Sequence, residues 1–62
     1  MMSTKKASEI VAGDKIFTSD SPNKPQLVLA SYSLGDNWGI EVKDVRMILQ
    51  VKPDDTLKVW TN

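Results

Sequence analysis

The chain has 62 residues, in which eight Lys and Arg balance eight Asp and Glu, and it contains neither Cys nor His. A chain of this length forms one domain with a single small core, and the two missing residue types exclude disulfides, thiolate metal sites and the usual zinc ligands. The balanced charge also disfavours a dedicated nucleic-acid-binding protein, because such proteins carry a basic excess that neutralises phosphates.

The N-terminal segment, residues 1–6, is polar and lacks periodicity, which predicts a flexible end ahead of the folded domain. No apolar run follows its two lysines, so it does not have the pattern of a signal peptide. No stretch of the chain reaches membrane-spanning length. These features predict a cytoplasmic protein that has no membrane partner.

The next part of the chain is predicted to contain one helical turn, one short strand and one long loop. Residues 7–10 form the helical turn, which Ser8 can cap, and residues 11–14 form a tight turn. Residues 15–18 have the composition of a strand. Residues 19–25 have the composition of a loop, and neither of their two prolines has an N–H to donate within a central strand.

Three strands are predicted to follow this loop. Residues 26–34 are rich in aliphatic side chains, and Gly-Asp-Asn at 35–37 is typical of a hairpin turn. Residues 38–42 alternate apolar and other residues with period two, which is the pattern of a half-buried strand. The apolar residues of the strand predicted over 46–51 have the opposite parity, so residues 43–44 are expected to form a tight turn or a bulge.

The chain is expected to end with a short turn and one more strand. Residues 52–55 form the turn, including a single turn of 3₁₀ helix that starts near Pro53, and residues 56–60 form an alternating strand. Short strands without a long helix predict an all-β fold, either a small barrel or a pair of packed sheets. The single folded domain is expected to cover residues 7–62.

Three stretches of the chain carry a resemblance to a known kind of domain. Residues 7–14 read Ala-Ser-Glu-Ile-Val-Ala-Gly-Asp, Trp38 follows the central hairpin, and residues 51–57 place a proline-bearing turn before the last strand. These features resemble SH3-like barrels of small bacterial and phage-encoded proteins, whose entry reads Ala-x-x-Leu-x-x-Gly-Asp. The resemblance covers residues 13–60 and implies a five-stranded SH3-like barrel with a short 3₁₀ turn before its last strand. The tyrosine that such domains carry near Thr56 is absent, so binding of proline-rich peptides is not implied.

The predicted core consists of the inward-facing apolar residues of these elements: Ile10, Ile16, Val28, Ile40, Val42, Met47, Leu49, Val51, Leu57 and Val59. Facing within residues 26–34 stays open, because Leu27 and Leu29 compete for the core with Val28, Ala30 and Tyr32. One set is expected to face the other sheet and the second set to face a partner.

Partner binding is predicted at four residues, Trp38, Pro53, Lys58 and Trp60. Trp38 has the parity of the inward residues of its strand, so it either covers the core or stands half-exposed beside Pro53 in a groove for an extended partner. Trp60 and Lys58 are expected to point outward together. Trp60 then packs on a neighbouring strand, or contacts another protein or a second copy of the chain.

A nucleic-acid interface is the alternative use of the later strands. Its basic residues would be Lys43, Arg46, Lys52 and Lys58, beside aromatic side chains on which bases stack. Carboxylates are interleaved with these cations along the sequence. This pattern favours a solvated surface of mixed charge.

Enzymatic activity is not expected from this sequence. Without His or Cys, the remaining candidates are Ser31 or Ser33 with a lysine, and the carboxylates of Asp36, Asp54 and Asp55, which are more typical of turns. A barrel this small is also expected to have no room for a ligand pocket of roughly 300 Å³. The sequence therefore predicts no catalytic residue, metal site, cofactor or small-molecule substrate.

The function predicted from the sequence is that of a non-enzymatic binding module. It would be a small bacterial or phage-type accessory protein that acts by protein–protein interaction in the cytoplasm, or in the host cytoplasm if a phage encodes it. Two alternatives stay open, a weak nucleic-acid binder and a structural subunit of a homo-oligomer. Salt separates nucleic-acid binding from a protein contact, because phosphate binding weakens steeply as salt rises.

Overall fold

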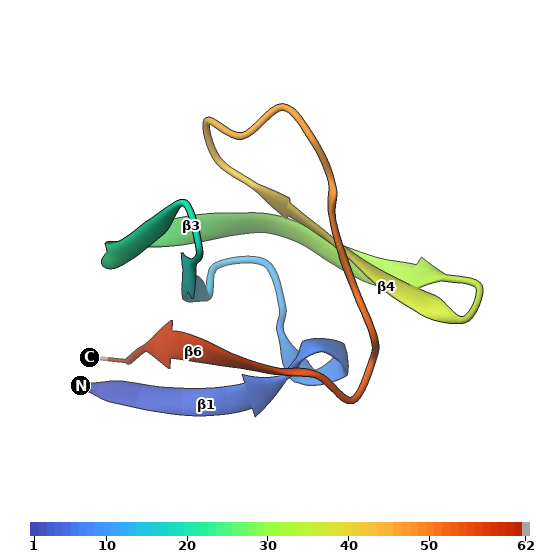
Figure 1. The fold of residues 1–62 in the computed structure, drawn as a ribbon, viewed down its shortest axis with the longest axis horizontal. Coiled ribbons are helices and arrows are strands. Elements are labelled where there is room, and N and C mark those ends of the chain that lie inside the picture. Colours follow the sequence, from blue (N-terminus) through green and yellow to red (C-terminus); the bar gives the residue numbers. More distant parts are fainter. Residues whose placement is uncertain (62) are drawn as a thin grey trace.

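The computed structural model describes residues 1–61 of the chain as one antiparallel sheet (Figure 1). The strands are β1 (Met2–Lys6), β2 (Lys15–Thr18), β3 (Ser21–Leu34), β4 (Asn37–Val42), β5 (Leu49–Val51) and β6 (Thr56–Trp60), and a 3₁₀ helix, η1 (Ala7–Glu9), follows β1. Their order across the sheet is β1-β6-β2-β3-β4-β5. The all-β prediction is confirmed, but the sheet ends in two edges, β1 and β5, and does not close. None of the described residues belongs to a helix long and apolar enough to cross a membrane.

Strand β1 corrects the prediction that residues 1–6 are flexible. It lies beside β6 in Figure 1, and its register runs from Met2 opposite Trp60 to Lys6 opposite Thr56. The pairing continues at the end of the strand, where the Thr61 N–H donates to the Met1 carbonyl at 2.7 Å. Apart from Met2 its side chains are polar, which suits an edge strand that gains from backbone pairing without burying an apolar face.

The 3₁₀ helix η1 lies where the sequence predicts a helical turn, but its cap differs from the prediction. The Lys6 N–H donates to the Glu9 carboxylate at 3.0 Å, and no cap from Ser8 is present. Ala7 is fully buried, and its N–H donates to the Asp55 carbonyl at 2.7 Å. This bond ties η1 to the turn before β6.

Strand β3 is longer than predicted, because it begins at Ser21 after a two-residue turn. The loop predicted over residues 19–25 is therefore wrong for residues 21–25. Ile16 pairs with Gln26 and Thr18 with Ser21, so Phe17 alone stands opposite residues 22–25. Both prolines lie in this bulge, where no ladder hydrogen bond requires their missing N–H groups.

A second register shift in β3 determines which of its side chains face the core. Val28 pairs with Val42, whereas Ser31 pairs with Ile40, and the shift lies between Val28 and Ala30. An extra residue reverses the side-chain alternation of a strand. Val28 is therefore buried and Leu29 is exposed, while beyond the shift the odd-numbered Ser31 faces the core side.

The segment after β4 contains less strand than the sequence predicts. Lys43 and Asp44 form the expected turn, in which Asp44 has a φ of 66°, but β5 starts only at Leu49. Residues 45–48 are a loop, and Met47 is 80% exposed, so its assignment to the core is wrong. The turn at Pro53 and Asp54 is present without the 3₁₀ helix expected there.

The core lies on the inner face of the bent sheet, under η1. Its buried members are Ala7, Ile10, Ile16, Val28, Ile40, Val42 and Val59. All except Ala7 were predicted. Leu49, Val51 and Leu57 pack against this cluster but stay partly exposed, and this difference defines the site described next.

Candidate functional site

Two of the four predicted partner-binding residues make contacts within the protein. Trp38 is partly buried on the core side, and its indole Nε1–H donates to the Ser31 hydroxyl at 2.7 Å. Pro53 lies in the turn before β6, and its carbonyl accepts the Ser8 N–H at 3.1 Å. Trp38 therefore packs against the core, which is one of the two positions predicted for it.

The other two predicted residues, Lys58 and Trp60, lie on the outer face of β6. The buried neighbour Val59 points to the core, so Lys58 and Trp60 point away from it, as predicted. Trp60 is 41% exposed and stands opposite Met2 of β1. Lys58 and Trp60 thus lie on the outer face of the sheet, whereas Trp38 packs on the core side.

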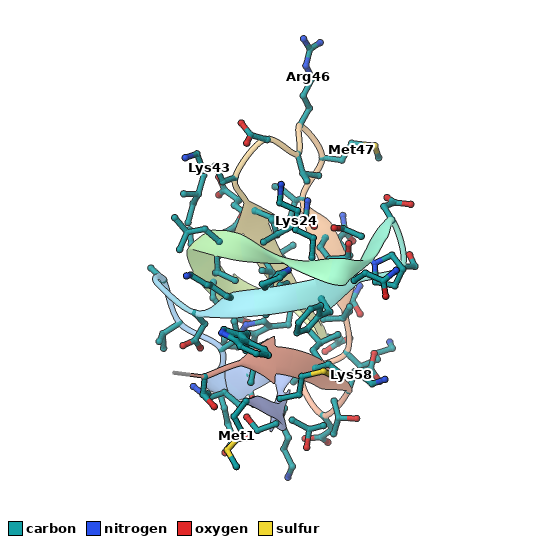
Figure 2. The ribbon with its side chains drawn as sticks, turned by 90° about the vertical axis from the view of Figure 1, so that its left-hand side faces the viewer. Met1, Lys24, Lys43, Arg46, Met47 and Lys58 are labelled. Atoms are coloured by element: carbon teal, nitrogen blue, oxygen red, sulfur yellow. The ribbon has the colours of Figure 1, made fainter. Side chains whose placement is uncertain are left out.

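The basic residues of the nucleic-acid alternative are also dispersed. Figure 2 shows the Arg46 side chain pointing away from the rest of the molecule at one end, with Lys43 near it, whereas Lys58 lies toward the other end. Lys52 is exposed just after β5. These four cations do not line one groove.

The structure instead has an apolar cleft that the sequence did not predict. It has a volume of about 310 Å³ and is lined by Phe17, Thr18, Ser19, Asp20, Gln26, Val42, Val45, Leu49, Val51 and Leu57. The expectation that so small a domain has no room for such a space is wrong. The reason is the short edge strand β5, which has three residues and pairs only with β4.

The lining of the cleft combines two kinds of side chain. Core-side residues such as Val42, Leu49 and Leu57 are apolar, whereas Ser19 and Asp20 of the β2–β3 turn are polar and exposed. Next to this turn the Thr18 hydroxyl donates to Gln26 Oε1 at 3.0 Å. A bound group would meet both an apolar surface and hydrogen-bonding groups.

A second hollow of about 500 Å³ continues the cleft along the β4–β5 loop. It is lined by Asp20, Asp44, Val45, Arg46, Met47, Ile48, Leu49 and Gln50, three of which also line the cleft. Val45, Met47 and Ile48 are exposed apolar residues. Together the two hollows form a continuous apolar surface with two carboxylates beside it.

The two carboxylates, those of Asp20 and Asp44, have no cationic partner within residues 1–61. The one ion pair in that part of the chain joins Lys5 to Asp14 at 3.1 Å, and it lies outside the cleft. Arg46 also lines the second hollow, but its side chain points away from the rest of the molecule (Figure 2). The surface is therefore suited to a ligand that combines apolar groups with a positive charge.

Tyr32 and Glu41 show a different kind of contact on the outer face of β3 and β4. Hydrogen bonding to the Glu41 carboxylate, together with its negative charge, raises the pKa of the Tyr32 hydroxyl above its usual range. Neither residue lines the cleft, so this contact has no part in the candidate site.

Comparisons of the chain with protein-family models, with curated proteins and with solved structures found no match. The sequence feature that could have indicated the cleft is the group of apolar residues Val45, Met47, Ile48 and Leu49, the last three of which lie in the strand predicted over residues 46–51. Edge position and loop conformation decide its exposure, and neither can be read from periodicity.

Proposed function

We propose that the protein is a non-enzymatic binding module that holds an apolar segment of a partner protein in the cleft. One observation carries the proposal: part of the core, at Leu49, Val51 and Leu57, stays accessible in a cleft that continues onto exposed apolar side chains. Exposed apolar surface in a small domain is unfavourable in water, and it commonly marks an interaction site.

The chemistry of the surface narrows the partner to a polypeptide segment with a large apolar residue next to Lys or Arg. The cleft is close to the lower limit of ligand pockets, about 300 Å³, which suits inserted side chains better than a cofactor. The carboxylates of Asp20 and Asp44 lie beside the apolar surface and complement a basic residue.

The proposal includes an SH3-like arrangement of the strands. It is supported by the position of β6, which pairs antiparallel with β2 so that the five strands expected from the sequence run β6-β2-β3-β4-β5. Strand β1 adds to the edge of this set. The bacterial or phage-type accessory role and the cytoplasmic location belong to the proposal on the basis of the sequence resemblance and small size.

The absence of catalysis is also proposed, and the positions of the carboxylates support it. The Asp55 carboxylate accepts the Lys52 N–H at 3.0 Å, so it serves the turn before β6. Asp36 lies in the β3–β4 turn and Asp54 in the β5–β6 turn, both exposed. A purified sample with hydrolytic activity that is lost in Asp54→Asn would contradict this part of the proposal.

Selection of peptides from a random library on the immobilised protein tests the binding function. We expect the recovered peptides to pair a large apolar residue with Lys or Arg. Fluorescence polarisation then compares their affinities for the parent and for Val45→Gln, which should bind about tenfold more weakly, or by about 1.4 kcal/mol. Asp20→Asn should weaken the preference for the basic residue.

Val11→Gln is the matched control, because Val11 is an exposed valine that does not line the cleft. It should bind the peptides as the parent does. Equal affinities for the parent and Val45→Gln would contradict the proposed site, as would recovered peptides that lack large apolar residues.

A further inference from the structure

The outer face of β1, β6 and β2 has a composition unlike that of the cleft. Residues directly opposite each other in antiparallel strands point to the same face, so the register defines this surface, here called the lysine face. Its members are Met2, Thr4, Lys6, Lys15, Thr56, Lys58 and Trp60. All seven are exposed, and no carboxylate is among them.

Trp60 lies between two lysines of this face. Lys58 precedes Trp60 by two residues on β6, which separates their Cα atoms by about 7 Å along the strand. Lys15 is directly opposite Trp60 on β2, with the two backbones about 5 Å apart. Neither lysine forms an ion pair with another residue in the range 1–61. At the far end of the face, the Lys6 backbone N–H donates to the Glu9 carboxylate at 3.0 Å.

The charge of the lysine face distinguishes among the partners that could bind it. A second copy docked by two-fold symmetry would bring the lysine face against itself, and like charges opposite each other are destabilising. An anionic membrane is disfavoured because a membrane-bound face inserts a broad apolar surface, whereas here Met2 and Trp60 are flanked by lysines. Single-stranded nucleic acid fits both the exposed tryptophan and the lysines around it, since bases stack on aromatic rings while lysines contact phosphates.

We infer that the lysine face binds single-stranded nucleic acid, with a base stacked on Trp60 and adjacent phosphates at Lys15 and Lys58. This inference goes beyond the proposed protein-binding function and uses a different face. The balanced net charge of the chain does not indicate this basic site, because the fold separates these lysines from the carboxylates at the turns. The proposed site shares only Lys58 with the four basic residues that the sequence suggested for nucleic-acid binding.

Trp60 fluorescence provides the test, in a Trp38→Phe background that leaves it as the single tryptophan. Titration with an oligothymidylate should quench its emission. The logarithm of the binding constant should fall with the logarithm of salt concentration with a slope of about −1.4, or about 0.7 for each of two phosphates. Lys15→Ala and Lys58→Ala should each reduce this slope by about half.

Lys24→Ala and Lys52→Ala are matched controls, because both replace exposed lysines outside the lysine face. Both should keep the parent slope and affinity. Replacing the ring itself, as Trp60→Leu, should weaken binding about tenfold or more when measured by polarisation of a labelled oligothymidylate.

Three results would overturn the inference. The first is unchanged Trp60 emission at low salt and high oligothymidylate concentration, and the second is an equal slope for the parent and the Lys15→Ala/Lys58→Ala double variant. The third is stronger binding to vesicles that contain phosphatidylserine than to the oligonucleotide, which would assign the face to a membrane. A thermal melt of each variant confirms that the exposed substitutions leave the fold intact.

Discussion

The last two strands, β5 and β6, show how pairing on one side or two sides changes what a strand exposes. β6 has five residues and lies between β1 and β2, whereas β5 has three residues and pairs only with β4. Val59 of β6, which pairs with both Ser3 and Ile16, is buried. Leu57 of β6, which pairs only with Lys5, is partly exposed, as are Leu49 and Val51 of β5. In these two strands the residue that is paired on both sides completes the core, whereas the residues paired on one side leave the cleft open.

The largest effect is expected for truncation of a residue beneath the doubly paired part of the sheet. Ile16 is fully buried opposite Val59, so Ile16→Ala should lower the free energy of unfolding by about 2–5 kcal/mol. Leu49→Ala should cost less, about 1–2 kcal/mol, because Leu49 already contacts solvent in the cleft. Urea denaturation measures both, and equal losses would contradict the difference between the two strands.

A proline in β1 tests the contribution of the second neighbour of β6. Met1 and Thr61 exchange two backbone hydrogen bonds. Hydrogen-bonded pairs alternate with non-hydrogen-bonded pairs along an antiparallel ladder. The Ser3 N–H therefore faces β6, whereas the Thr4 N–H faces solvent. Ser3→Pro should therefore destabilise the fold by about 1–3 kcal/mol. Thr4→Pro is the matched control and should cost clearly less in the same urea titration.

A smaller effect is expected at the loop that leads into β5. Met47 is 80% exposed, so Met47→Ala should change the free energy of unfolding by no more than about 0.5 kcal/mol. A loss of about 2 kcal/mol in thermal or urea unfolding would instead place Met47 in the core, as the sequence predicted.

The smallest effect is a local titration on the hairpin of β3 and β4. Tyr32 is the single tyrosine of the chain, so the ultraviolet absorbance of tyrosinate reports its pKa alone. Glu41→Gln should lower that pKa toward its usual value of about 10, because the neighbouring carboxylate raises it in the parent. The raised pKa means that the folded state holds the proton more tightly, so this contribution to stability is present below pH of about 10 and is lost as pH rises through the folded value. An unchanged titration in Glu41→Gln would show that the two groups do not interact.

Local patterns in the sequence determined the all-β fold and most of the core. Strict alternation in residues 38–42 and 56–60 identified two strands and the facing of Ile40, Val42 and Val59, because a strand repeats its facing every two residues. The Gly-Asp-Asn turn identified the hairpin between β3 and β4 for an equally local reason, since turn geometry depends on the residues within the turn.

Only the tertiary structure decided the features that concern function. Strand β1 has no apolar alternation, and its pairing with β6 joins residues from opposite ends of the chain. The register shift after Val28 and the short length of β5 also depend on neighbouring strands. The cleft and the lysine face arise from these long-range pairings, because exposure is set by which strands lie side by side, and that information is absent from any short stretch of sequence.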